Sequence, residues 1–186
     1  MYPRYILQAL EAAKYHEDLT FSFENLKKGK ITKSMFHLRA YFWELWSVWE
    51  YILQHANIET LKLPSKEVRR DFIEQLKQKF PKYKFLKVLE KIQNEEYFKR
   101  IKLIRDHAHN WQIAPYGVPI MVIHDDSKVV RAMKLNNIDK DKELPMDIYI
   151  ERNDLGFMEH VVKTLSEKGF FKDSEVVFNI TSVWRK

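Results

Sequence analysis

The chain has 186 residues, of which 45% are hydrophobic, and it contains no cysteine. This composition is typical of a globular protein with a sizeable core, and it excludes a disulfide framework, thiolate chemistry and a zinc–thiolate site. No apolar run approaches the roughly 18 residues of a membrane span, and residues 1–4 do not resemble the start of a signal peptide. We therefore expect a cytoplasmic location and no membrane partner.

The net charge of +6 is distributed unevenly. Residues 1–112 carry 21 Lys and Arg against 14 Asp and Glu (+7), and residues 113–186 carry 11 against 12 (−1). Residues 62–105 alone hold 14 basic and 6 acidic side chains (+8). Clustered basic residues provide the sequence-independent part of nucleic-acid binding, so RNA is one expected partner, with weak and salt-sensitive binding. A solvated, lysine-rich helix face is the other interpretation.

Apolar residues recur at helical spacing from the start of the chain. Pro3 and Gly29 suit the first turn and the terminator of a helix over residues 3–27. A second helix, over residues 32–56, carries the broadest apolar face. That face consists of Met35, Leu38, Phe42, Leu45, Trp46, Trp49, Ile52, Leu53 and Ala56. We expect this helix to be the most buried, with its tryptophans in the core rather than in base stacking.

Shorter helices follow the first two. Ser65 is the expected cap of a third helix, which reaches Phe80 and is ended by Pro81. Residues 83–92 form another short helix that could continue into the next one. Together these segments predict a mainly α protein, a bundle of four to five helices with short connections. The polar residues of the first two helices, His16, Glu17 and His37, are interpreted as surface or boundary residues.

The stretch from Asn94 to Trp111 concentrates chemically able side chains. Its apolar residues repeat at steps of 4, 3, 4 and 3, which predicts one continuous helix with a single buried face. That face is Tyr97, Ile101, Ile104, Ala108 and Trp111. Asn94 is the expected cap of this helix. Its last turns gather the candidate site residues Arg105, Asp106, His107, His109 and Asn110.

Helical geometry divides these side chains into two pairs. Arg105 and His109 lie one turn apart on one flank of the apolar stripe, and Arg100 and His107 lie about two turns apart on the other. Arg100 and His107 lie closer to the stripe, so we expect them to be partly used in packing. Arg105 and His109 lie further from it, where both could reach one phosphate.

The same stretch resembles the signature of the HEPN superfamily (higher eukaryotes and prokaryotes nucleotide-binding), whose members are small helical domains that include many RNases. That signature is an arginine, often followed by a polar residue, and then a histidine after four to six intervening positions. Arg100 to His107 has six intervening residues and fits the spacing. Arg105 has the polar follower Asp106, but His109 comes after only three positions, and Asn110 stands where the histidine would otherwise fall.

The resemblance, which covers roughly residues 1–112, implies metal-independent endoribonuclease activity without a cofactor. In that chemistry a histidine moves a proton at the ribose 2′-hydroxyl or the leaving oxygen, and an arginine holds the phosphate. The four candidate catalytic residues are Arg105, His109, His107 and Arg100, with Asp106 and Asn110 in support. The resemblance also implies a homodimer, in which two protomers bring their motifs together in one cleft.

The pattern changes after Trp111, where a second unit over residues 113–186 is predicted. Residues 118–123 and 129–135 form a predicted hairpin, residues 146–151 a third strand, residues 155–168 a helix ended by Gly169, and residues 176–181 a last strand. These segments form a small α+β element that packs on the HEPN-like bundle of residues 1–112.

Two other functions are compatible with these residues. One is a non-catalytic HEPN-like binding or interaction module with a protein partner: a scaffold, an antitoxin-like protein or a phage-defence component. The shortened Arg105–His109 spacing favours it. The other is a metal-dependent hydrolase that uses His107, His109, His124, Asp125 and Asp126. It is the least favoured, because these residues fall on different predicted elements, and a hairpin turn explains the Asp-Asp-Ser sequence as well.

Overall fold

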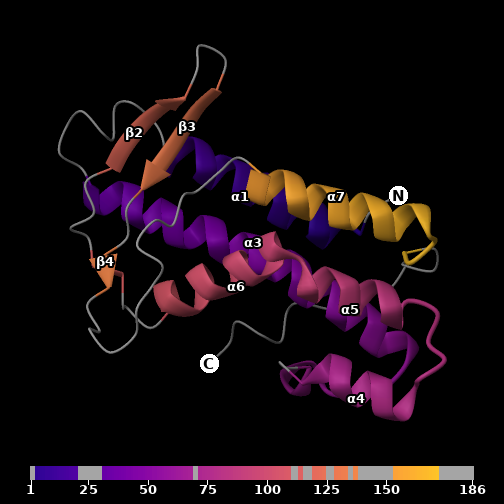
Figure 1. Cartoon of the computed structure of the whole chain (residues 1–186). Coiled ribbons are helices and arrows are strands. Elements are labelled where there is room, and N and C mark those ends of the chain that lie inside the picture. The colour runs from indigo at the N-terminus through magenta and orange to yellow at the C-terminus, as the bar shows by residue number, and fades with distance from the viewer. Residues whose placement is uncertain are drawn as a thin grey trace.

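The computed structural model describes residues 3–20, 31–68, 71–109, 113–114, 119–124, 128–133, 136–137 and 153–171. It describes only the backbone of residues 31–35, 107–109, 113–137 and 153 within these ranges. The described part is mainly helical, with six α-helices, one short 3-10 helix and four short strands (Figure 1). The predicted mainly α class with a helical bundle is therefore confirmed.

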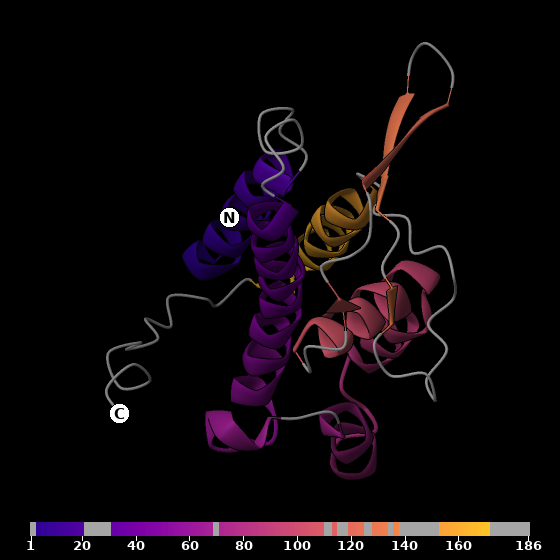
Figure 2. The ribbon, with the colours of Figure 1, turned by 90° about the vertical axis from the view of Figure 1, so that its left-hand side faces the viewer.

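The bundle is built around one long helix, α3 (Ile31–Glu59), with α1 (Arg4–Thr20) packed along it. Figure 2 shows α3 between α1 on one side and α6 (Glu96–His109) on the other. Most of the apolar face predicted for α3 is buried, namely Leu38, Phe42, Leu45, Trp49, Ile52, Leu53 and Ala56. Its partners surround it, which explains why this helix carries the broadest apolar face. The predicted end of the first helix, residues 21–27, lies outside the described residues.

The third helix is shorter than predicted. Ser65–Glu67 form a 3-10 helix (η1), and Val68, with ψ 87°, leaves helical geometry. The α-helix α4 begins only at Phe72 and ends at Lys79. The apolar spacing from Val68 to Phe80 was compatible with one helix. Asn57 holds the connector that precedes this segment. The buried Asn57 side chain donates to the Leu63 carbonyl and accepts from the Leu63 amide.

The predicted start of the helix at Asn94 is also corrected. Asn94 is the last residue of α5 (Leu86–Asn94), where its side chain donates to the Glu90 carbonyl. Glu95 is extended (φ −64°, ψ 143°), and its carbonyl accepts the first hydrogen bond of α6, from the Lys99 amide. From Glu96 to His109 the helix is continuous. The break therefore precedes the Arg/His cluster and leaves the spacing argument for that cluster intact.

Phe98, rather than Tyr97, is the first buried residue of α6. Phe98 packs edge-on against Trp49, whereas Tyr97 is half-buried and stacks on Phe157. Ile101 and Ile104 are buried as predicted. Residues 97 and 98 differ by about 100° around the helix, so Phe98 meets Trp49 of α3 while Tyr97 meets Phe157. The Ala108 side chain and Trp111 lie outside the described residues.

Four short strands follow α6. In the predicted hairpin, β2 (Pro119–His124) pairs antiparallel with β3 (Lys128–Met133), and Val122 faces Val130 in the register. The two-residue strands β1 (Ile113–Ala114) and β4 (Asn136–Asn137) also pair antiparallel. The strands predicted over residues 146–151 and 176–181 lie outside the described residues, so the complete α+β element stays a prediction.

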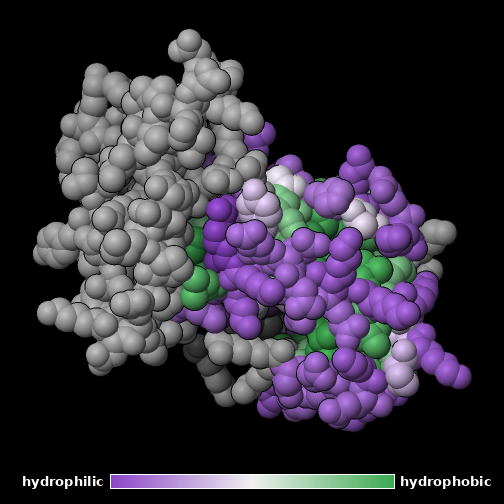
Figure 3. All heavy atoms as spheres, viewed as in Figure 1, coloured by the Kyte–Doolittle hydropathy of each residue, from purple (hydrophilic) through white to green (hydrophobic). Residues whose placement is uncertain are grey.

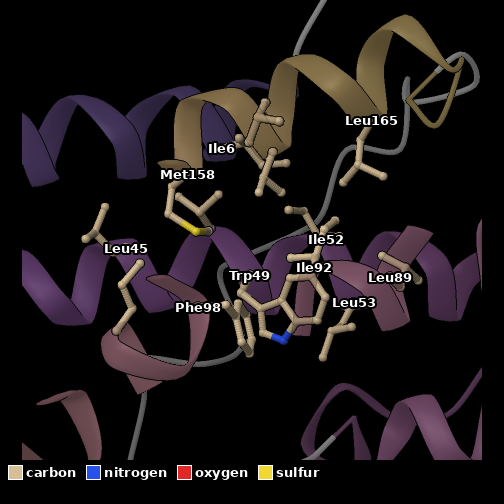
Figure 4. Packing of buried hydrophobic residues seen from close by; sticks show 14 of the residues in the cluster. Ile6, Leu45, Trp49, Ile52, Leu53, Leu89, Ile92, Phe98, Met158 and Leu165 are labelled. Carbon is tan, nitrogen blue, oxygen red and sulfur yellow. The ribbon is translucent and has the colours of Figure 1, made fainter. Parts of the chain in front are cut away.

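The last helix, α7 (Asn153–Glu167), packs on the bundle against α1, α3 and α6. Gly169 ends it, as predicted, with a positive φ of 77°. The buried residues of α7 and of the turn after it are part of the same hydrophobic cluster as α1 and α3. Figure 4 shows Met158 and Leu165 of α7 on one side of α3, with Trp49 and Phe98 on the other. The division of the chain at residue 112 stays a prediction.

No helix in the described part of the chain combines the length and the apolar character needed to cross a bilayer.

Candidate functional site

Helix α6 brings the two predicted arginines to different surroundings. Both side chains are about one-fifth exposed, 22% for Arg100 and 21% for Arg105. The predicted difference, in which Arg105 lies further from the packed face than Arg100, is therefore not visible in the exposure of the two side chains. His107 and His109 lie on the last turn of α6, but their side chains, and the whole of Asn110, are outside the described residues. The catalytic roles of the two arginines and two histidines, and the supporting roles of Asp106 and Asn110, stay predictions.

Arg100 binds a carboxylate that is fully buried. Its Nε lies 3.0 Å from Oδ1 of Asp154, and a terminal guanidinium nitrogen donates to the same oxygen. Asp154 is 0% exposed and lies in the first turn of α7, where the positive end of the helix dipole favours a carboxylate. The guanidinium also lies 4.9 Å from the centre of the Tyr97 ring. Arg100 thus connects α6 to α7, in agreement with the expectation that it is used in packing.

Arg105 lies against the aromatic surface of α3. Its guanidinium carbon is 5.2 Å from the ring centre of Trp46 and 5.9 Å from that of Trp43. One terminal nitrogen contacts Oδ1 of Asp106 at 2.8 Å, and the other lies 3.8 Å from Oε1 of Glu50. The same Glu50 oxygen accepts a 2.8 Å hydrogen bond from the Trp46 indole. Two aromatic rings and two partly exposed carboxylates therefore fix the orientation of this arginine.

The α3 residues around Arg105 were missed as site residues by sequence reasoning. Trp43 is 46% exposed, Trp46 is half-buried and Trp49 is buried, so the three tryptophans do not share one role. The signal was present in the spacing, since residues 43, 46 and 50 are separated by three and four positions and lie on one face of a helix. That face borders the core instead of pointing into it.

A second polar contact joins α1 to α3. The Nδ1 atoms of His16 and His37 are 3.1 Å apart, and the two ring centres are 5.3 Å apart. Both histidines are boundary residues, as expected. Glu17 is not, because it is 7% exposed and its charge acts on the buried Tyr41. Burial, with the nearby carboxylates of Asp154 and Glu17, raises the pKa of Tyr41.

No three metal-ligand side chains come together among the residues whose side chains the structure describes. The residues of the metal-dependent hypothesis, His107, His109, His124, Asp125 and Asp126, have side chains outside that part.

Comparisons with family models, with curated proteins and with solved structures find no match to this chain.

Proposed function

We propose that the protein is a HEPN-like RNA-binding protein that cleaves RNA, without a metal ion, at a site formed by Arg105 and His109. One observation supports the choice of Arg105: its guanidinium is oriented beside the exposed ring of Trp43, and its contact with Glu50 is long, at 3.8 Å. A phosphate can displace so long a contact, and it would gain parallel hydrogen bonds from the planar guanidinium.

The chemistry needs a base, an acid and a phosphate ligand. A neutral histidine removes the proton of the 2′-hydroxyl, whose oxygen attacks phosphorus while the bond to the 5′-oxygen breaks. The 5′-oxygen takes a proton from a protonated histidine, so the products are a 2′,3′-cyclic phosphate and a 5′-hydroxyl. Arg105 stabilises the charge that develops on the phosphate oxygens. His109 follows Arg105 by one helical turn and is the candidate base.

The exposed aromatic residues of α3 support the proposed homodimer. Phe36 is 57% exposed, and Trp43, seven residues later on the same helix face, is 46% exposed. Large aromatic side chains are enriched in the buried core of protein interfaces. A second copy that covers this face would bring two Arg105 sites close together. Sedimentation at micromolar concentration tests this proposal, and replacement of both aromatics by serine should leave only monomer.

A non-catalytic binding module is the second candidate, and the Arg100–Asp154 pair favours it. Arg100 belongs to the pair with the family's spacing, yet its guanidinium is bound to a buried carboxylate. The remaining pair, Arg105 and His109, has the shorter spacing. A chain that keeps the helical scaffold and uses the arginine for packing is compatible with lost catalysis.

Incubation of the purified protein with mixed RNA, with and without EDTA, separates the two functions. The proposal predicts EDTA-resistant cleavage to cyclic phosphate ends, lost in Arg105→Ala and His109→Ala. Lys163→Ala, on the outer face of α7, is the matched control and should cleave normally. RNA binding without cleavage supports the binding module, and absence of both binding and cleavage contradicts both functions. Loss of activity only in Arg100→Ala and His107→Ala would move the site to the other flank.

A further inference from the structure

The turn between α4 and α5 carries an exposed aromatic ring among lysines. Phe80, the residue that follows α4, is 40% exposed. Residues 77–91 contain six lysines and one acidic residue, Glu90, a net charge of +5 over 15 residues. The lysines are Lys77, Lys79, Lys82, Lys84, Lys87 and Lys91, and all six are exposed. In Figure 3 the surface over α4 and α5 is mostly hydrophilic.

Hydrogen bonds hold this turn in one conformation. The Tyr83 amide donates to the Phe80 carbonyl at 2.9 Å, which closes a β-turn with Pro81 in its second position. The Phe80 amide donates to the Leu76 carbonyl at 2.7 Å. The Tyr83 hydroxyl donates to Glu59 at 2.7 Å and so connects the turn to the end of α3. The backbone that carries Phe80 and the neighbouring lysines is therefore held in place before any ligand binds, which lowers the entropy lost on binding.

The positive charge of this surface is less neutralised than that of Arg105. Of the six lysines, Lys77 contacts Glu90 at 3.2 Å, and Lys84 lies over the Phe85 ring at 4.6 Å. Lys87 and Lys91 lie one turn apart on one flank of α5, and Lys84 lies in the turn before that helix. Arg105, in contrast, is bound by two carboxylates. A phosphate backbone would thus be attracted more strongly to the α4–α5 turn than to the Arg105 site.

We propose that this surface binds single-stranded nucleic acid, with phosphates on the lysines and one base stacked on Phe80. Basic grooves that carry aromatic rings bind single strands in this way, because every base offers a π-face. Of the three aromatic residues in the turn, Phe80 is the one available to stack on a base, because Phe85 is buried and the Tyr83 hydroxyl is bound to Glu59. One exposed ring suits a stacked base better than insertion into a membrane. This inference rests on the proposed function only for the choice of RNA as the strand.

The surface is separate from the candidate site. In Figure 1 the α4–α5 turn lies at one end of the α5–α6 layer, and the last turn of α6 lies at the opposite end. A strand that engaged both would run along α5 and α6.

Fluorescence anisotropy with a labelled 20-nucleotide oligouridylate tests the inference. Phe80→Ala should weaken binding about fivefold or more without a change in the salt dependence, and Phe80→Trp should retain binding. The triple variant Lys79→Gln, Lys82→Gln and Lys84→Gln should lower the slope of log K against log salt by about 2, from about 0.7 for each phosphate contact. The matched control changes Lys14, Lys163 and Lys168 to Gln, three exposed lysines of α1, α7 and the turn after it. A duplex of equal length should bind more weakly than the single strand.

Each outcome has a defined meaning. Equal losses in the two triple variants would show an effect of net charge alone and overturn the inference. Binding to phosphatidylserine vesicles with no affinity for the oligonucleotide would do the same. If the affinity for the oligonucleotide depended on Arg105 but not on Phe80, the inference about this surface would be overturned. The proposed function would remain supported. Affinity that depends on Phe80, with no cleavage by any variant, would leave this surface standing and remove the proposed activity.

Discussion

The side chains of Arg100 and Arg105 are almost equally exposed, but the carboxylate that binds Arg100 is buried and those near Arg105 are partly exposed. We therefore expect the two alanine substitutions to change the free energy of unfolding by different amounts. Removal of Arg100 leaves the carboxylate of Asp154 buried without its cation, which destabilises a protein by about 3 kcal/mol or more. Removal of Arg105 leaves Asp106 and Glu50, whose side chains are 25% and 55% exposed, in contact with water. We expect Arg105→Ala to change stability by about 1 kcal/mol or less. Urea denaturation of the two alanine variants checks this, and equal losses would contradict it.

The sequence could place both arginines beside the buried face of one helix and could assign Arg100 to packing, but it could not identify the partners of either arginine. Asp154 lies 54 residues after Arg100, and Trp43 and Glu50 lie on a different helix from Arg105. Contacts of this kind depend on how the helices pack against one another. The spacing of residues within one helix does not reveal them. The candidate site was therefore predictable as a cluster on one helix turn and not as a set of contacts.

The His16–His37 contact predicts a loss of stability at acidic pH. Burial, and then the charge of His37, lowers the pKa of His16. In the unfolded chain histidine takes up its proton near pH 6.5, and the folded state resists that proton. The free energy of unfolding should therefore be unaffected above this pH and should fall as the pH decreases through and below it. His37→Ala should raise the pKa of His16 in an NMR titration, and an unchanged pKa would contradict the assigned cause.

At the scale of the helices, the sequence predicted long elements better than their ends. The buried face of α3 could be read directly, because one broad apolar stripe runs along most of the helix. The break at Glu95 was predicted one residue early, at the expected Asn94 cap, since the residues on both sides of it continue a helical period. The break before α4 was missed for the same reason. In both places the chain must turn to bring a short helix onto the core, and tertiary packing overrides the local pattern.

Gly156 lies inside α7 and Gly169 lies just after its end, and we expect alanine at these two positions to change stability in opposite directions. Gly169 has a φ of 77°, and the Phe170 amide after it donates to the Leu165 carbonyl at 2.9 Å, which is the hydrogen bond of a Schellman terminator. Gly169→Ala should destabilise the protein by about 1–2 kcal/mol. Gly156 is inside the helix, and an added Cβ would meet nothing within 4 Å. Gly156→Ala should stabilise by about 0.5 kcal/mol. Thermal melts check both signs, and a stabilising Gly169→Ala would contradict the assignment.

At the scale of the whole molecule, the hydrophobic cluster formed by the described residues includes residues from both sides of the predicted division at residue 112. The last described segment contributes seven buried apolar side chains. They are Leu155, Met158, Val161, Val162, Leu165, Phe170 and Phe171. Two further contacts hold this segment: Asp154 binds Arg100, and the Phe170 carbonyl lies 2.8 Å from Nε2 of the buried His55. The change of sequence pattern after Trp111 predicted a second unit that packs on the bundle, but it could not show that the side chains of α7 belong to the same core.

This arrangement predicts that residues 1–112 do not form a stable bundle alone. Without α7, the apolar surfaces of α1, α3 and α6 that it covers would face water, and burial of such a surface contributes about 25 cal/mol per Å². A fragment of residues 1–112 should lose the cooperative thermal transition of the whole chain and bind a hydrophobic dye. A peptide of residues 150–172 added in trans should restore the transition, and a chain shortened only to residue 172 is the control, because it retains α7. If instead the fragment melted cooperatively at the temperature of the whole chain, the bundle would be an independent domain and α7 an appendage on its surface.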